Sequence, residues 1–316
     1  MNTITELSPA TAAERIKTYA TEHYFDACGI ASASHSGNET HLSEWLDRGF
    51  HADMNWMERT REQRNDVQQK LPGTRSVIVV AKNYFTPRPE APDVASGKIS
   101  RYAWGRDYHR ALRKPLIRLA KYVESLAPET QTYSSIDTGP VLERTWAARA
   151  GIGSIGKNSL ALRRDMGSWF FLATILTTLE AEPDSPAVDI CGTCTACLDV
   201  CPTQAIVSPG IVDSNRCISY QTIENRGDIP DELHSAHGDW VYGCDICQEV
   251  CPWNRFETPT QEQDFFPRLD HANPPLDYFA RMNEEQFKAE FEGTPVRRTG
   301  HEGLRRNAMI VRQNTP

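Results

Sequence analysis

Eight of the nine cysteines in this chain lie between residues 191 and 251, in two runs whose spacing suits iron-sulfur chemistry. The first run reads C-x2-C-x2-C-x3-C-P, and the second is a separate cysteine followed by C-x2-C-x3-C-P. Bacterial two-cluster ferredoxins share this pattern, and the last cysteine of the run binds the other cluster. A tight loop with these spacings reaches several iron corners of one cubane, and the proline ends the loop without requiring an amide donor. The runs comprise Cys191, Cys194, Cys197 and Cys201, then Cys217, Cys244, Cys247 and Cys251.

The crossing of the terminal cysteines predicts two 4Fe-4S clusters. One is held by Cys191, Cys194, Cys197 and Cys251, and the other by Cys201, Cys217, Cys244 and Cys247. In the second set an insertion of 26 residues separates Cys217 from its partners. Two clusters in one module indicate that electrons move through it, and a purely structural pair is the alternative.

Other uses of the cysteines fit the pattern less well. Structural zinc sites also use paired C-x2-C motifs, but zinc leaves the third cysteine of the first run without a role. A disulfide framework suits small secreted chains, whereas this chain is long and has an odd cysteine count. The ninth cysteine, Cys28, lies in an apolar context and is interpreted as a buried small residue rather than a reactive thiol.

The composition describes a chain that can build its own core. It has 316 residues, of which 39% are hydrophobic, and a net charge of -8. The longest apolar run, residues 169–179, is interrupted by threonines and is too short to span a bilayer. The first residues lack the basic and apolar regions of a secretory signal, so we expect a cytoplasmic protein with no membrane partner. The acidic charge argues against wholesale nucleic-acid coating but leaves room for a local phosphate-binding patch.

Several segments have the patterns of regular elements. Ser8 followed by Pro9 predicts the start of a helix. Residues 29–31 begin an extended segment, and the β-branched run 75–81 predicts a buried strand. Residues 108–126 have helical periodicity with basic residues between the apolar ones.

Asp137 is the candidate catalytic carboxyl group. Residues 132–136 predict a short strand, and residues 138–150 predict a helix that ends at Gly151. Asp137 therefore lies at the carboxyl end of a strand, where catalytic groups of α/β proteins are often placed. The alternative, weighted equally from these residues alone, is that Asp137 caps the helix that follows it.

Two further segments lie between this helix and the cysteine module. Residues 160–162 and 169–178 predict a hairpin whose second arm is apolar on both faces. The glycine-rich run 151–156 invites a dinucleotide-binding interpretation, but it follows a helix and precedes a strand, the reverse of the Rossmann order. Residues 181–186 are a plausible linker.

Several stretches of sequence together resemble epoxyqueuosine reductases. They run in the family's order from about residue 10 to residue 312, which makes the match more specific than any one motif. The family is similar to the reductive dehalogenases. The stretches are residues 71–76 (LPGTRS), 100–109 (SRYAWGRDYH), 137–144 (DTGPVLER), 150–153 (AGIG), 157–159 (KNS), 216–220 (RCISY) and 242–245 (YGCD).

The resemblance implies an α+β fold, in which a cobalamin-binding α/β domain with a mixed sheet flanked by helices is fused to a two-cluster ferredoxin-like module. We expect residues 1–183 to form the first domain and residues 184–258 the second. Residues 259–316 are expected to be a short helical C-terminal segment, the start of a truncated helical-repeat domain. The implied reaction converts epoxyqueuosine to queuosine at the wobble position of tRNA. The implied reductant is cobalamin, which receives electrons through the two clusters from an external low-potential donor. We expect a monomer.

The resemblance also implies roles for individual residues. Asp137 matches the family's proton donor, and an acid working at neutral pH needs a raised pKa, which burial against an apolar corrin face would provide. No glycine follows Asp107-Tyr108-His109 at the place required by a common corrinoid signature, so the resemblance implies base-off cobalamin without a histidine ligand. Residues that match stretches around the corrin or substrate are Arg64, Ser100, Arg101, Asp137, Arg144, Lys157, Asn158, Ala161, Ser219, Asp245 and Ile246. Surface ion pairs are the alternative role for the three arginines.

Basic residues outside the site could contact tRNA phosphates. An ordinary solvated helix face is the alternative for them. They are Arg110, Arg113, Lys114 and Arg118, and the terminal Arg297, Arg298, Arg305, Arg306 and Arg312. Competing functions are a plain electron-transfer protein, a reductive dehalogenase-like enzyme acting on a small molecule, and a zinc-containing nucleic-acid binder.

Overall fold

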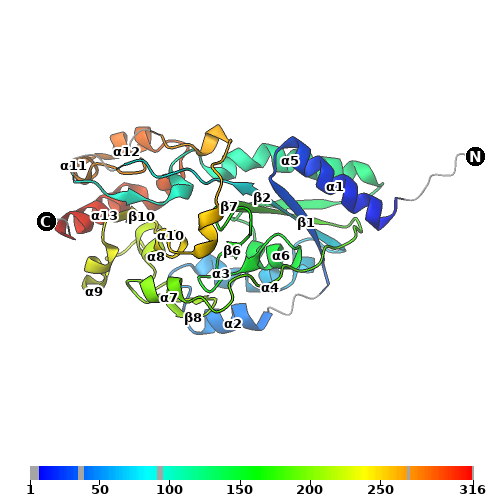
Figure 1. Ribbon diagram of the computed structural model, residues 1–316, viewed down its shortest axis with the longest axis horizontal. Helices are drawn as coiled ribbons and strands as arrows, with labels where there is room; N and C mark the ends of the chain where they lie inside the picture. Colours follow the sequence, from blue (N-terminus) through cyan, green and yellow to red (C-terminus); the bar gives the residue numbers. More distant parts are fainter. Residues whose placement is uncertain (1–6, 35–38, 91–94, 269–270, 315–316) are drawn as a thin grey trace, which may run out of the picture.

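A four-stranded sheet forms the centre of the computed structural model, which describes residues 7–34, 39–90, 95–268 and 271–314 (Figure 1). The strand order is β1-β2-β7-β4, and all three neighbouring pairs are antiparallel. The expected α+β class is confirmed. The sheet is antiparallel rather than mixed, because every strand runs opposite to its neighbours. The strands are β1 (Ala27–Ser32), β2 (Ser76–Asn83), β7 (Phe170–Thr177) and β4 (Thr132–Ser135).

The two central strands are apolar on both faces because helices cover both sides of the sheet. Helices α1 (Pro9–His23) and α5 (Tyr108–Leu126) pack on one face, and α6 (Glu143–Arg149) packs on the other (Figure 1). Ile78 belongs to the core on the first face and its neighbour Val79 to the core on the second. This alternation is the period of two that a strand imposes on its side chains.

Several expected elements are confirmed. Helix α1 begins at Pro9, and the Ser8 hydroxyl accepts a hydrogen bond from the Thr11 amide at 3.2 Å. Helix α5 has the expected bounds, and the Asp107 carboxylate caps it by accepting from the His109 amide at 2.9 Å. The strand predicted at 75–81 is β2.

Two expectations on the way to the cysteine module are wrong. The helix expected from residue 138 begins only at Glu143, with Leu142 at its N-cap, so Asp137 caps no helix. The predicted hairpin does not form: β6 (Ala161–Leu162) pairs with β5 (Ser154–Ile155), whereas β7 joins the main sheet. A strand that is apolar on both faces needs a position covered on both sides, and only the sheet centre offers one.

The cysteine module is built from short elements. They are α7 (Ala196–Val200), the hairpin of β8 (Ile206–Ser208) and β9 (Ile211–Val212), α8 (Ile218–Ile223), α9 (Asp231–His234), β10 (Trp240–Tyr242), α10 (Ile246–Glu249) and the 3-10 helices η3 (Ser235–His237) and η4 (Pro252–Phe256). Strand β10 pairs in parallel with β3 (Lys98–Ile99), so the module is joined to the N-terminal part of the chain by backbone hydrogen bonds.

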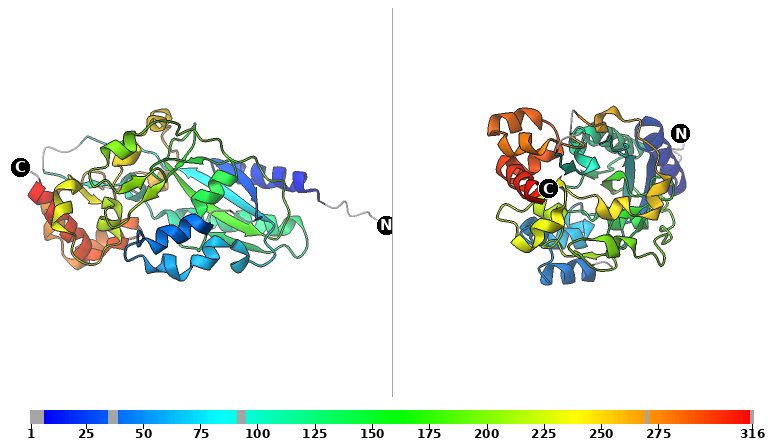
Figure 2. Two further views of the ribbon diagram at one scale, coloured as in Figure 1. Left: turned by 90° about the horizontal axis from the view of Figure 1, so that it is seen from below. Right: turned by 60° about the vertical axis from the view of Figure 1, so that its left-hand side comes forward.

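The C-terminal helices pack on this second small sheet. Val241 of β10 and Ile99 of β3 share a core with Leu276, Phe291 and Leu304. These helices lie at one end of the molecule and α1 lies at the other (Figure 2). Their bounds are α11 (Leu276–Arg281), α12 (Glu284–Glu290), η6 (Pro295–Thr299) and α13 (Gly300–Asn314).

The remaining helices connect β1 to β2 or flank the C-terminal segment. They are α2 (Glu39–Asp47), α3 (Asn55–Arg59), α4 (Arg61–Asn65), η1 (Val67–Gln69), η2 (Arg101–Ala103) and η5 (Gln263–Phe265). Among the described residues, every helix is too short or too polar to cross a bilayer.

Candidate active site and cluster module

The first set of four cysteines surrounds a cavity of about 160 Å³. Burial raises the pKa of the Cys197 thiol, and the charges of Cys191, Cys251 and Cys194 raise it further. These four thiols are therefore close neighbours, although Cys251 is far from the others in sequence. The cavity is lined by Cys191, Cys194, Cys197 and Cys251 together with Lys157, Asn158, Leu162, Ala196, Pro252, Trp253 and Arg255.

The second set is gathered in the same way. Burial raises the pKa of Cys247, and the charges of Cys217 and Cys201 add to the effect. Burial also raises the pKa of Cys244, and the charges of Cys247 and Cys217 add to this effect. The fold thus groups the same cysteines as the crossing rule does. It brings Cys217 close to Cys244 despite the 26 residues between them. The charge of Cys197 also acts on Cys247, so the two sets adjoin.

The grouping of the eight thiols suits two clusters, since four of them line one cavity and the other four lie together beside it. All nine cysteines are free thiols. Among the described residues, no group of three or more His, Cys, Asp or Glu side chains is placed to hold a single metal ion.

Asp137 lies in the loop between β4 and α6, in a left-handed backbone conformation with a φ of 57°. Non-glycine residues seldom adopt this conformation, and such strain is frequent at active sites. The Tyr108 hydroxyl donates a hydrogen bond to Oδ2 of Asp137 at 2.9 Å. Nε2 of His109 lies 3.5 Å from the same oxygen. Helix α5 therefore presents two side chains from its first turn to this carboxylate.

Positive neighbours dominate the pKa of Asp137 in the protein itself. Burial raises this pKa, but the contacts with His109 and Tyr108 and the charge of Arg144 outweigh burial and hold it below its ordinary value. Asp137 is therefore ionised at neutral pH in this structure, and the raised pKa expected from a corrin face stays a prediction.

His109 holds a proton beside this carboxylate. Burial lowers the pKa of His109, but Asp107 and Asp137 raise it more strongly, to about 9. Nδ1 of His109 lies 2.8 Å from Oδ1 of Asp107, which orients the ring. At neutral pH the protonated imidazole of His109 therefore lies between the carboxylates of Asp107 and Asp137.

Glu143 is a second proton-bearing group at the site. Burial and the charge of Asp137 raise its pKa to about 8, and the Ser135 hydroxyl donates to its Oε1 at 3.2 Å. Sequence reasoning missed Tyr108, His109 and Glu143. The first two were considered only as part of a corrinoid signature, and Glu143 lay within a quoted motif without a role.

Charged side chains at this site reach the molecular surface. The side chain of Asp137 is 64% exposed. Arg144 is likewise exposed while burial lowers its pKa, and it donates to the Ser159 carbonyl at 2.5 Å. Exposed charged side chains of this kind suit the polar periphery of a large cofactor.

The residues expected around a cofactor fall into three groups. Arg64 and Arg144 lie near Asp137 and Glu143, as the effects of these carboxylates on their pKa values show. Lys157 and Asn158 reach the cysteine loops: Nζ of Lys157 donates to the Cys194 carbonyl at 2.8 Å and the Asn158 amide donates to the Cys247 carbonyl at 3.2 Å. The third group is spread over several elements: Ser100 precedes η2, Ala161 lies on β6, Ser219 on α8 and Ile246 on α10. The side chain of Ala161 is buried in the core.

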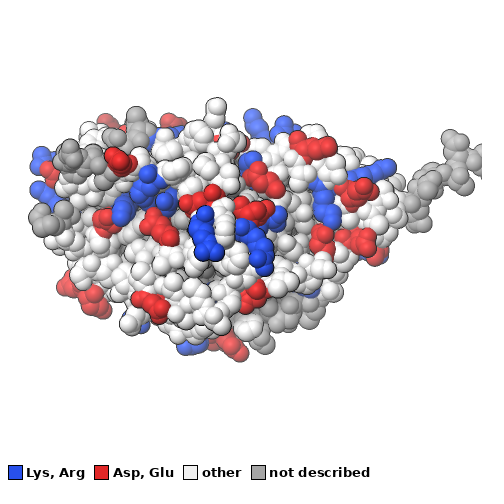
Figure 3. Space-filling model, in the orientation of Figure 1, with Lys and Arg blue, Asp and Glu red and all other residues white. Residues whose placement is uncertain are grey.

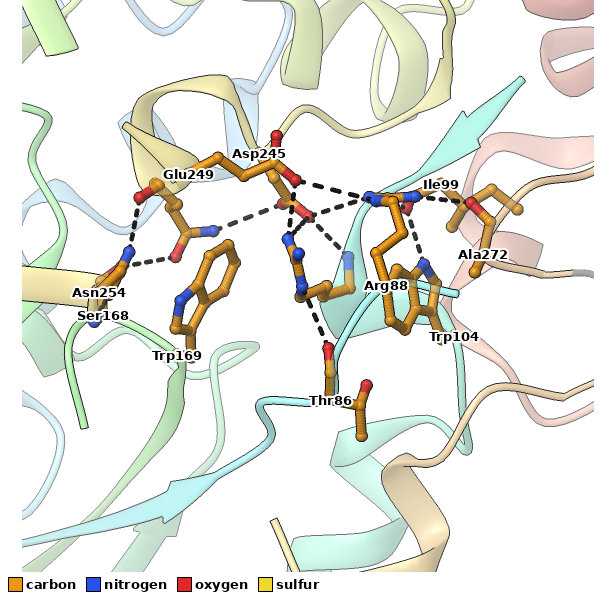
Figure 4. Close-up of polar contacts among 12 residues, drawn as sticks. Thr86, Arg88, Ile99, Trp104, Ser168, Trp169, Asp245, Glu249, Asn254 and Ala272 are labelled. Atoms are coloured by element: carbon orange, nitrogen blue, oxygen red, sulfur yellow. Dashed lines mark hydrogen bonds and ion pairs between the residues drawn. The ribbon is translucent and has the colours of Figure 1, made fainter. Parts of the chain in front are cut away.

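Arg101 and Asp245 belong to a different arrangement, the buried ion network of Figure 4. Asp245 accepts from the Arg101 amide at 2.9 Å and pairs with the guanidinium groups of Arg88 and Arg101 at 3.7 and 3.6 Å. Arg101 also donates to Glu249 at 2.9 Å. This network ties α10, which contains Cys247, to Arg88 and Arg101 in the N-terminal part of the chain. The side chains of Arg101 and Asp245 are therefore bound to protein groups.

The terminal arginines are not a uniform basic surface. Arg306 donates to the carbonyls of Gln221 at 2.8 Å and Asn225 at 3.2 Å, so it supports α8 and the loop after it. Arg298 pairs with Glu224 at 2.8 Å and stacks over Trp56. The charge of Asp137 helps to raise the pKa of Arg298, which places this C-terminal residue near the active site.

Comparison with known proteins agrees with this geometry. Residues 190–254 match the family described as a 4Fe-4S double cluster binding domain, and residues 64–138 match the family described as epoxyqueuosine reductase QueG. The chain is 47% identical to an epoxyqueuosine reductase of Synechocystis, over 89% of this chain and 98% of that protein.

Two solved structures are also similar. One is an epoxyqueuosine reductase with an epoxyqueuosine-modified tRNA-Tyr stem loop, at a TM-score of 0.88 and 32% identity over 95% of this chain and 80% of the other. The second is the Bacillus subtilis enzyme with its catalytic aspartate loop swung out of the active site, at a TM-score of 0.87 and 31% identity over 95% and 81% of the two chains.

Proposed function

The chain belongs to the epoxyqueuosine reductase family, and on that premise we propose that it reduces the epoxide of epoxyqueuosine in a tRNA anticodon to give queuosine. The observation that carries the proposal is the carboxylate of Asp137, held by Tyr108 and His109, in a chain that also folds a module for two iron-sulfur clusters. The substrate is proposed by analogy with the relative that binds a modified stem loop.

The proposed cofactors are two 4Fe-4S clusters and cobalamin. When bound, they supply single electrons and a strongly reducing cobalt centre at the substrate. The eight cysteines would hold the clusters in the two sets described above. Arg64, Arg144 and the polar residues around Asp137 would hold the cobalamin periphery, with Ser100, Ala161, Ser219 and Ile246 contributing from neighbouring segments.

The chain's own residues provide the proton. Opening an epoxide leaves an oxygen that must be protonated, and a positioned acid speeds such a step by about 10²- to 10⁴-fold. Since Asp137 is ionised and His109 is protonated, we propose that Nε2 of His109 supplies the proton to Oδ2 of Asp137, which passes it to the substrate oxygen. Glu143, with a pKa of about 8, is a nearby store for the next proton.

The test is anaerobic reconstitution with iron, sulfide and cobalamin, followed by an assay on tRNA that carries epoxyqueuosine. We expect optical and paramagnetic resonance signals of both cofactors and the appearance of queuosine in digests of the tRNA. Cluster signals without corrinoid absorbance or queuosine would instead favour a plain electron-transfer protein. The proposal includes a monomer in the cytoplasm that receives electrons from an external donor; light scattering and cell fractionation test the first two points.

A further inference from the structure

The cluster site formed by Cys191, Cys194, Cys197 and Cys251 is the more open of the two. Cys194 is exposed, whereas the other seven cluster cysteines are buried or partly buried. The cavity that these four thiols line extends past Lys157 and Arg255. Because electron transfer slows steeply with distance, an external donor that approaches Cys194 reaches this set first.

Positive charge surrounds this opening. Lys157 is held in place by the carbonyls of Gly192 and Cys194, at 2.6 and 2.8 Å. Arg164 stacks over Trp253 at 5.1 Å, and Arg255 stacks over Phe256 at 4.6 Å. Within the described residues neither arginine forms an ion pair, so their charges are available to a partner.

The cations lie on a chain whose net charge is -8. Figure 3 shows Lys and Arg side chains near the middle of the face that bears α7, α10 and β6, with Asp and Glu side chains beside them. Three acids lie close by in the sequence: Asp165 pairs with Arg163 at 2.6 Å, whereas Asp189 and Asp199 accept hydrogen bonds from the Cys191 amide and the Thr195 hydroxyl and keep their charges.

Apolar side chains accompany these cations. Phe256 is 47% exposed, Val200 40% and Val188 77%. Trp253, which lines the cavity, links Phe256 to the opening, since the two rings lie 5.9 Å apart. Exposed aromatic and aliphatic groups within a charged rim are typical of protein docking faces.

We propose that this face, defined by Lys157, Arg164, Arg255, Phe256 and Val200 around Cys194, docks a small acidic protein that donates one electron at a time. The proposal rests on the proposed function and names its electron donor by class. In each encounter the reduced donor loses one electron and the oxidised cluster bound by Cys191, Cys194, Cys197 and Cys251 gains it. The basic rim attracts the donor, and the apolar groups make the close contact.

The test measures reduction of the reconstituted protein directly, by the bleaching of its cluster absorbance in a stopped-flow instrument. The probe is a reduced plant-type 2Fe-2S ferredoxin, chosen to be acidic and strongly reducing. The variant Arg164→Glu/Arg255→Glu is compared with Arg15→Glu/Lys121→Glu, which changes the net charge equally on α1 and α5. We expect the first variant to lower the second-order rate constant by about tenfold or more at low salt, and the difference to shrink as salt is added.

Photoreduced deazaflavin, which needs no docking face, should bleach all three proteins at similar rates. Equal ferredoxin rates for the two variants at low salt would overturn the proposal. If the glutamate variant binds less iron, the milder variant Arg164→Gln/Arg255→Gln is used instead, and its rate constant with ferredoxin at low salt is compared with that of the control. The readout does not require an epoxide, so a wild-type protein that bleaches normally but makes no queuosine would refute the proposed function alone.

Discussion

Nε2 of His109 lies 3.5 Å from Oδ2 of Asp137, and the two groups carry opposite charges at neutral pH. The site therefore holds its proton on the histidine rather than on the carboxyl group. Tyr108 fixes the carboxylate from the other side by a hydrogen bond of 2.9 Å. Because the two side chains share one proton, their titrations belong to the pair.

Replacement of Asp137 by asparagine tests the proton donor. Asparagine tolerates the left-handed backbone at this position, so the loop should keep its shape. We expect the variant to bind iron and cobalamin normally and to lose about 10²- to 10⁴-fold in the rate of queuosine formation. Single-turnover assays on modified tRNA measure this, and a wild-type rate in Asp137→Asn would remove Asp137 from the mechanism.

The variant His109→Gln tests the proton source. In the wild type the rate should fall as pH rises through about 9, because His109 loses its proton there. His109→Gln should be slower at neutral pH and should lack this alkaline decline. Loss of the positive neighbour also lets the pKa of Asp137 rise toward its ordinary value. An unchanged pH profile in the variant would show that His109 does not supply the proton.

Glu143 should make stability depend on pH. Its folded pKa of about 8 lies above its ordinary value of 4.5, so the folded state binds this proton more tightly. The contribution is complete below pH 4.5 and is lost as pH rises to about 8, at no more than about 1.4 kcal/mol per pH unit. Glu143→Gln should therefore gain stability relative to wild type between pH 5 and pH 8.5. Urea denaturation measures the difference, and exposed Glu22→Gln on α1 serves as the control.

Serine variants of the cysteines test the grouping into two clusters. Cys251→Ser should remove the same cluster as Cys191→Ser, although Cys247 is much nearer in sequence. Cys217→Ser should remove the other cluster together with Cys247→Ser. Each variant should retain about half of the iron, and the paramagnetic resonance spectra should fall into two classes. If Cys251→Ser and Cys247→Ser gave the same spectrum, the crossing would be wrong.

Breaking the ion network of Figure 4 should lower the free energy of unfolding. Asp245→Ala leaves the buried charges of Arg88 and Arg101 without their shared partner, and we expect a loss of about 3–5 kcal/mol in unfolding free energy. Glu249 is 35% exposed, so Glu249→Gln should cost about 1 kcal/mol or less. Urea denaturation of both proteins checks the contrast, and similar losses would mean that burial does not govern this network.

Local patterns in the sequence were sufficient for much of the fold. Helix α5, the start of α1 and strand β2 follow from caps and apolar periodicity, which neighbours in the chain determine. The cysteine spacing indicated two clusters for the same reason, since a short loop can reach only nearby iron atoms, and the crossed ligands remain a prediction. The sequence also predicted that Asp137 directly follows a strand.

Tertiary structure alone decided the chemistry of the site. The pKa of Asp137 is lowered by His109 and Tyr108, which lie on α5 and come close only when that helix packs on the sheet. The pairing of β7 with β2, the binding of Arg101 and Asp245 in one network, and the openness of Cys194 are likewise relationships through space. Spacing along a chain specifies local geometry, whereas charge and burial at a site depend on atoms that the fold brings from elsewhere.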